Sequence, residues 1–130
     1  MTKEEWGKEA RERGVCIVCN WSFGTLRHDP NGKEYVERNE EKEQIVRDFM
    51  NQSDENVLNA HFKAYGLVGM VYNHASNTHP DGEGILSSGV MTIERCEGYS
   101  PANKFYIVTT LSGSRYYIHA EDYDRLHFSL

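Results

Sequence analysis

From residue 67 onward the sequence consists of short runs of strand-forming residues separated by clusters of Gly, Pro, Asn and Ser. Runs rich in Val, Ile, Thr, Tyr and Phe and bounded by turn residues predict β-strands. The expected strands are residues 67–72, 85–95, 105–111 and 115–119. Because such short connections join antiparallel neighbours, the C-terminal half, residues 67–130, is predicted to form a small antiparallel sheet.

The N-terminal half, residues 1–66, favours helices. Residues 2–13 are rich in Glu, Lys and Arg, and Thr2 with Glu5 has the spacing of a capping box, so a helix is expected to end at Gly14. A second helix is expected from an Asn39 cap to about residue 52. The apolar stripe of this second helix consists of Ile45, Val46, Phe49 and Met50.

A third helix is expected to begin at Ser53 or Asp54 and to end at Gly66, and residues 120–127 can add a helical turn. Residues 15–19 are a mostly apolar run of strand length, and residues 29–32 carry a turn signal. The prediction is therefore one α+β domain over residues 1–130. Its helical N-terminal half packs on a small antiparallel sheet from the C-terminal half.

The chain carries a formal net charge of −6. This balance argues against non-specific nucleic-acid binding, which depends on Lys and Arg at phosphates, and it permits binding to a basic protein surface. The N-terminus lacks the apolar core of a signal peptide, and no apolar run approaches the ~20 residues that span a bilayer. Three cysteines do not suggest a secreted disulfide scaffold, so the expectation is a cytosolic protein.

Cysteine and histidine residues suggest a metal or redox site, but their spacing favours inert side chains. Cys16 and Cys19 would point to opposite faces of a strand, and Cys96 stands alone, so buried cysteines are preferred to a metal or a redox pair. His74 and His79 lie in a polar loop, and a loop that is solvated or contacts a ligand is preferred to a metal site. No cofactor is expected.

The clearest candidate site is the hairpin with the sequence TLSGSRYYI, residues 110–118. Hydroxyls and turn amides can bind phosphate oxygens, Arg115 can add a bidentate contact, and a tyrosine can stack on a base. Because strand residues alternate faces, Tyr117 is expected beside Arg115 and Tyr116 in the core. The candidate ligand-binding residues are Ser87, Ser88, Ser112, Ser114, Arg115, Tyr117, His74 and His79.

A structural alternative exists for the same residues. The serines can join the strand to the hairpin by hydrogen bonds, and Arg115 can pair with Glu121 or Asp122. For Arg115 the two interpretations are evenly weighted, whereas for the serines the structural role leads.

The pattern PDG-x-x-I-x-[ST]S-x-V followed by T-x-SGS-x-Y-x-[LI], over residues 79–118, resembles the C-terminal module of short phage and prophage proteins. This chain departs from the pattern at Ser87, where Thr is usual, and in the longer connection over residues 94–104. Phage proteins of this size include anti-Thoeris and anti-CBASS sponges, which sequester nucleotide signals, and anti-CRISPR-like inhibitors. The resemblance implies a non-catalytic counter-defence protein in the host bacterial cytosol that binds a nucleotide immune signal, with homo-oligomerisation expected.

Two alternatives remain open. The acidic residues Glu40, Glu41 and Glu43 suggest a protein–protein inhibitor of a host defence effector such as a CRISPR nuclease. The loop residues His74 and His79 suggest a small hydrolase.

Overall fold

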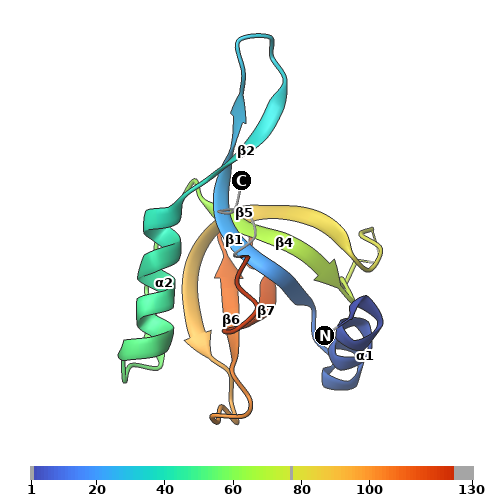
Figure 1. Cartoon of the computed structure of the whole chain (residues 1–130), viewed down its shortest axis with the longest axis vertical. Helices are drawn as coiled ribbons and strands as arrows, with labels where there is room; N and C mark the ends of the chain where they lie inside the picture. The colour runs from blue at the N-terminus through green and yellow to red at the C-terminus, as the bar shows by residue number, and fades with distance from the viewer. Residues whose placement is uncertain (1, 77, 125–130) are drawn as a thin grey trace.

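The computed structural model describes residues 2–76 and 78–124 and consists of two helices and a seven-stranded mixed sheet (Figure 1). The elements in chain order are α1 (Lys3–Arg13), β1 (Ile17–His28), β2 (Glu34–Arg38), α2 (Glu40–Gln52), β3 (Val57–Leu58), β4 (Gly66–Tyr72), β5 (Glu83–Arg95), β6 (Phe105–Thr110) and β7 (Arg115–His119).

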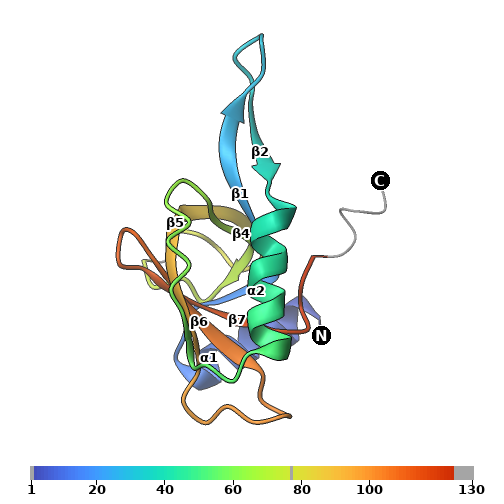
Figure 2. The same cartoon turned by 90° about the vertical axis from the view of Figure 1, so that its left-hand side faces the viewer.

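The sheet runs in the order β2-β1-β4-β5-β6-β7 and curls until β7 meets the start of β1 in a parallel pairing of Ile17 with Tyr117. A second parallel bridge, between Trp21 and Tyr123, continues the same seam. β3 pairs with β5 and lies off the main path. Figure 2 shows the curled sheet with α2 alongside it.

The predicted fold, a helical N-terminal half on a C-terminal sheet, is wrong. The apolar run at residues 15–19 extends into the twelve-residue strand β1, which pairs with β2, β4 and β7. The N-terminal half therefore supplies the strand around which the sheet closes.

An irregularity in β1 explains its long apolar run. Ile17 and Cys19 pack against α1, whereas Val18 lies in the core inside the sheet. The pairing of β1 with β4 shifts between Cys19 and Ser22, and Asn20 has a φ of 54°. Such a bulge reverses the alternation of side chains, so that Trp21 also faces the inner core.

The two predicted helices before residue 53 are confirmed, with their caps. Thr2 accepts a hydrogen bond from the Glu5 amide, and Asn39 accepts one from the Lys42 amide. Of the α2 stripe, Val46, Phe49 and Met50 are buried, whereas Ile45 remains exposed.

The predicted third helix is absent, and its residues run beside β5 instead. His61 and Lys63 have φ values of 49° and 52°, which a right-handed helix excludes. The Phe62 amide donates to the Val90 carbonyl over 2.8 Å, so the edge of β5 takes up the hydrogen-bonding capacity of this segment.

The predicted C-terminal strands are confirmed with small shifts at their ends. The proposed last helical turn is wrong for the described residues 120–124, where Tyr123 forms a bridge to β1; residues 125–127 lie outside the described part.

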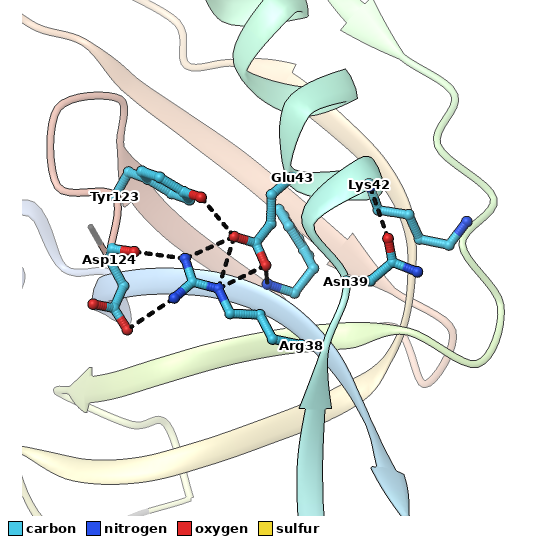
Figure 3. Close-up of polar contacts among 7 residues, drawn as sticks. Arg38, Asn39, Lys42, Glu43, Tyr123 and Asp124 are labelled. Carbon is cyan, nitrogen blue, oxygen red and sulfur yellow. Dashed lines mark hydrogen bonds and ion pairs between the residues drawn. The ribbon is translucent and has the colours of Figure 1, made fainter. Parts of the chain in front are cut away.

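A buried polar cluster joins β2, α2 and the segment after β7 (Figure 3). The Arg38 guanidinium contacts the Glu43 carboxylate at 2.7 Å, and their side chains are 8% and 1% exposed. The Tyr123 hydroxyl donates to the same carboxylate over 2.8 Å, and Asp124 lies 3.5 Å from Arg38. The segment after β7 is thereby held against β2 and α2, which are consecutive in the chain.

Candidate functional site

Two hollows lie on either side of the first residues of β7. Arg115 and Tyr117 line both of them, whereas Tyr116 is buried in the inner core. The predicted alternation of the two tyrosines is therefore confirmed, and Arg115 shares a face with Tyr117.

The first hollow, which we name the β1–β7 hollow, has a volume of about 560 Å³. It is lined by residues 14–16 and 73–75, together with Arg115 and Tyr117. None of these described lining residues is acidic. A volume in this range suits a small-molecule ligand, and the cationic Arg115 favours an anion.

The β1–β7 hollow lies beside the parallel pairing of β7 with β1, which joins Tyr117 to Ile17. The Tyr117 amide donates to the Cys16 carbonyl over 2.8 Å, and Arg115 lies before this contact on β7. Opposite, Asn73 has a φ of 58° and its side-chain amide donates to the Val15 carbonyl over 3.0 Å. This bond fixes the β4–β5 loop against the end of α1.

A charged pair supports the same wall from behind. The Asp81 carboxylate accepts from the Asn73 amide over 2.8 Å, and its other oxygen lies 2.8 Å from the Arg11 guanidinium. Asp81 therefore holds the backbone at Asn73 while its own charge is compensated by α1.

His74 brings a hydrogen-bond donor to the β1–β7 hollow. Its Nδ1 accepts from the Ser76 amide over 3.3 Å and lies 2.8 Å from the Ser76 hydroxyl. This pattern assigns the proton of the neutral ring to Nε2, which is then a donor. The His79 ring packs on His74 with a centroid distance of 4.8 Å, but His79 is not among the residues that line the hollow.

The second hollow, the β5–β7 hollow, has a volume of about 710 Å³ and balanced charge. Its lining is Asn56, residues 94–97, Tyr99, Ile107, Arg115 and Tyr117. Glu94, Ile107 and Tyr117 are cross-strand neighbours and form its floor. Two glutamates make this hollow a poorer anion site than the β1–β7 hollow.

Among the residues that the structure describes, Arg115 has one carboxylate partner, Glu94, and it is neither of the two expected. Its Nη2 lies 3.4 Å from Glu94, and the two side chains are 57% and 38% exposed. Glu121 pairs with Lys104 instead, and Asp122 accepts from the Asn20 amide over 2.7 Å. Exposed pairs contribute about 0–1 kcal/mol, so Glu94 is a weak competitor for a bound anion.

The Cys16 thiol and the Tyr117 phenol stay neutral in this setting. Burial, with a smaller contribution from Asp81, raises the pKa of Cys16 to about 12. Burial also raises the pKa of the Tyr117 hydroxyl above its ordinary value. Because a protonated thiol is a poor nucleophile and a poor metal ligand, Cys16 contributes only shape to the hollow.

Cys16 and Cys19 do belong to different cores, as predicted: Cys16 packs on the inner core and Cys19 lies under α1. Within residues 2–76 and 78–124, no three His, Cys, Asp or Glu side chains are grouped closely enough to hold a metal ion. None of the helices in this part of the chain is long and apolar enough to cross a membrane.

The four predicted serines lie outside both hollows and bind one another or the backbone. Ser88 and Ser112 are joined by their hydroxyls at 3.1 Å, and Ser114 lies 3.3 Å from Ser112. The Ser87 hydroxyl accepts from the Leu67 amide over 2.8 Å and donates to the carbonyl of Ser88. The structural alternative is therefore confirmed for Ser88, which joins β5 to the hairpin through Ser112, and is wrong for Ser87, which bonds to Leu67 of β4 instead.

The acidic segment is smaller at the surface than the sequence suggests. Glu40 and Glu41 are exposed, but Glu43 is fully buried in the Arg38 cluster. A partner can therefore reach only two of the three glutamates assigned to an inhibitory surface.

Sequence reasoning missed Asn73 and Glu94 as neighbours of Arg115. Asn73 follows a strand and precedes a polar loop, where Asn often adopts a left-handed conformation, so a local signal existed. Glu94 is brought to Arg115 by the pairing of β5, β6 and β7, and no local pattern reveals that register.

A comparison of the chain with known protein families, curated protein sequences and solved structures finds no significant match in any of the three. The resemblance to short phage proteins is not tested by these comparisons and stays a prediction.

Proposed function

We propose that the protein binds a small anionic ligand that carries a flat ring, of the nucleotide class, in the β1–β7 hollow, and that it does not transform this ligand. The observation that carries the proposal is the lining of this hollow. Arg115, Tyr117 and His74 border about 560 Å³ of space with no carboxylate among the described lining residues.

Each of the three side chains has a role in this proposal. Arg115 offers a charge-assisted, bidentate contact to a phosphate, because its pair with Glu94 occupies one edge of the guanidinium only. The Nε2–H of His74 adds a neutral donor. The Tyr117 ring offers a face on which a base can stack, a contact of roughly 1–3 kcal/mol in single-strand binders.

Sequestration of a nucleotide immune signal is the biological role we propose for such binding, on the basis of the phage resemblance. A sponge requires only tight, reversible binding in a preformed hollow. The support for this is the hydrogen bonding of Asn73 and Asp81, which fixes one wall of the hollow before a ligand arrives.

Thermal unfolding with a panel of cyclic nucleotides, linear nucleotides, a nucleoside and inorganic phosphate tests the binding. A ligand at about 100 times its Kd stabilises the native state by ~2.7 kcal/mol, which corresponds to a shift on the order of 5–10 °C here. The expected result is a shift with nucleotides that exceeds those with nucleoside or phosphate alone. A panel without any shift contradicts the proposal.

Recovery of the ligand after heat denaturation tests the absence of chemistry. We expect the nucleotide to be intact. A hydrolysed product would instead favour the loop hydrolase, in which Ser76, 2.8 Å from His74 Nδ1, is positioned as a nucleophile beside a base.

A further inference from the structure

The β1–β2 hairpin extends away from the rest of the molecule as an arm (Figures 1 and 2). Leu26, Tyr35 and Val36 on this arm are 44%, 49% and 42% exposed. Leu26 and Val36 are paired across one face, and Tyr35, paired with Arg27, lies on the other. Isolated two-stranded hairpins are marginally stable, so an arm with apolar residues on both faces is suited to a partner.

The arm is fixed at its base. Arg38, the last residue of β2, is held in the buried cluster with Glu43 (Figure 3), and the next residue, Asn39, caps α2. An interface built on the arm is therefore largely pre-organised, which reduces the entropy lost on association.

The outer edge of β2 has open backbone groups at known positions. The Asp29 amide donates to Lys33, and the Asn39 amide donates to Phe23, at the two ends of the β1–β2 ladder. Because hydrogen-bonded pairs alternate along antiparallel strands, Lys33, Tyr35 and Glu37 direct their backbone groups toward β1. Those of Glu34 and Val36 point outward, and no described strand pairs with that edge.

We propose that a second copy of this chain pairs with β2 along this edge, antiparallel and two-fold symmetric about Tyr35. Glu34 of each copy then lies opposite Val36 of the other and exchanges two backbone hydrogen bonds with it, four in total. The result is a four-stranded sheet made from two arms, a size that is independently stable more often than a hairpin.

Charge complementarity selects this register among the neighbouring ones. With Tyr35 on the axis, Lys33 of each copy lies opposite Glu37 of the other, which gives two opposite-charge pairs on the tyrosine face. A slip that places Glu34 opposite Glu34 sets like charges together. A slip in the other direction needs Arg38 opposite Glu34, but the Arg38 side chain is 8% exposed and bound to Glu43.

Light scattering coupled to size exclusion, over a range of protein concentrations, tests the proposal on the full chain. The wild type is expected to run as a dimer. K33E carries acids at both paired positions and E37K carries lysines at both, so each variant alone is expected to be monomeric. An equimolar mixture of the two is expected to form a heterodimer, because every facing pair is then of opposite charge.

V36P provides a backbone test, with V36T as its control. Proline removes an amide that points away from β1, so the arm is retained and the outer edge is blocked. V36P is expected to be monomeric and V36T dimeric, with unchanged circular dichroism spectra. A monomeric wild type at all concentrations overturns the proposal, as does a dimer that survives in V36P, or K33E and E37K chains that fail to associate on mixing.

Discussion

The Nη2 atom of Arg115 lies 3.4 Å from the Glu94 carboxylate, on the side of the β5–β7 hollow, while the same arginine lines the β1–β7 hollow on its other side. The guanidinium is thus shared between an internal acid and a space without acids. The Glu94 carboxylate therefore competes with any anion bound in the β1–β7 hollow for the charge of Arg115.

Replacing Glu94 by Gln is expected to strengthen nucleotide binding. The amide keeps the shape of the side chain but removes the charge that competes for Arg115. Because exposed pairs are worth roughly 0.2–1 kcal/mol, the Kd should fall by roughly 1.4- to 5-fold. Isothermal titration calorimetry measures this change, and a Kd that rises in E94Q contradicts the placement of the ligand beside Arg115.

Replacing Arg115 by Ala is expected to weaken the same binding by roughly 10- to 100-fold, since a hydrogen bond to a charged group contributes about 1.5–3 kcal/mol. Arg115 is exposed, so the melting temperature without ligand should change little. K8A is the matched control: it removes one positive charge from a side chain that is 77% exposed on α1. If R115A and K8A lose the same affinity for the nucleotide, the effect is one of net charge and not of a contact with Arg115.

Gly89 and Gly84, both on β5, are expected to differ sharply when replaced by Ala. A Cβ at Gly89 would lie 1.4 Å from the Lys63 carbonyl oxygen, because residues 61–65 run against this strand, whereas a Cβ at Gly84 meets nothing within 4 Å. G89A should lower the free energy of unfolding by more than about 2 kcal/mol, and G84A should leave it unchanged or raise it slightly. Urea denaturation distinguishes the two, and similar values for both variants would refute the close approach.

Removing Glu43 alone is expected to destabilise the fold by about 3–5 kcal/mol, because Arg38 stays buried without its carboxylate. The double variant R38M/E43L removes both charges and is expected to recover most of that loss. Chemical denaturation of the wild type, E43A and the double variant measures the coupling. If E43A is as stable as the wild type, the cluster does not fasten β2 to α2.

The stability of the protein is expected to depend on pH through Asp122. Burial is the largest cause that raises the pKa of this carboxyl above its ordinary value. The folded state therefore binds the Asp122 proton more tightly than the unfolded state does. The contribution of this proton to the free energy of unfolding is fully present below the ordinary pKa of ~3.9 and is lost as the pH rises through the raised pKa.

D122N isolates this effect, because its amide oxygen can still accept from the Asn20 amide. The variant should melt at a higher temperature than the wild type at pH 7, and the difference should shrink toward pH 4. Melting curves across this range provide the measurement. A constant difference would assign the effect to the hydrogen bond rather than to the charge.

Sequence patterns correctly predicted those features of the fold that depend on residues close to one another along the chain. The caps at Thr2 and Asn39 and the alternation of Tyr116 and Tyr117 follow from residues close in sequence, and they are confirmed. The prediction of a third helix is wrong because the backbone of Phe62 and its neighbours forms hydrogen bonds with β5. An amphipathic pattern in the sequence does not show that a strand edge is available for such bonds. The neighbours of Arg115 depend on strand register, which short-range reasoning cannot provide.

The seam between β7 and β1 has a consequence for biosynthesis. Tyr117 and Tyr123 meet Ile17 and Trp21, which the ribosome makes about a hundred residues earlier. In the nascent chain, β1 therefore lacks its pairing with β7, and Trp21 lacks its contact with Tyr123, until almost the whole described segment has been translated. Chains released early by a stop codon before Arg115 should be substrates for chaperones or proteases rather than smaller versions of the same protein.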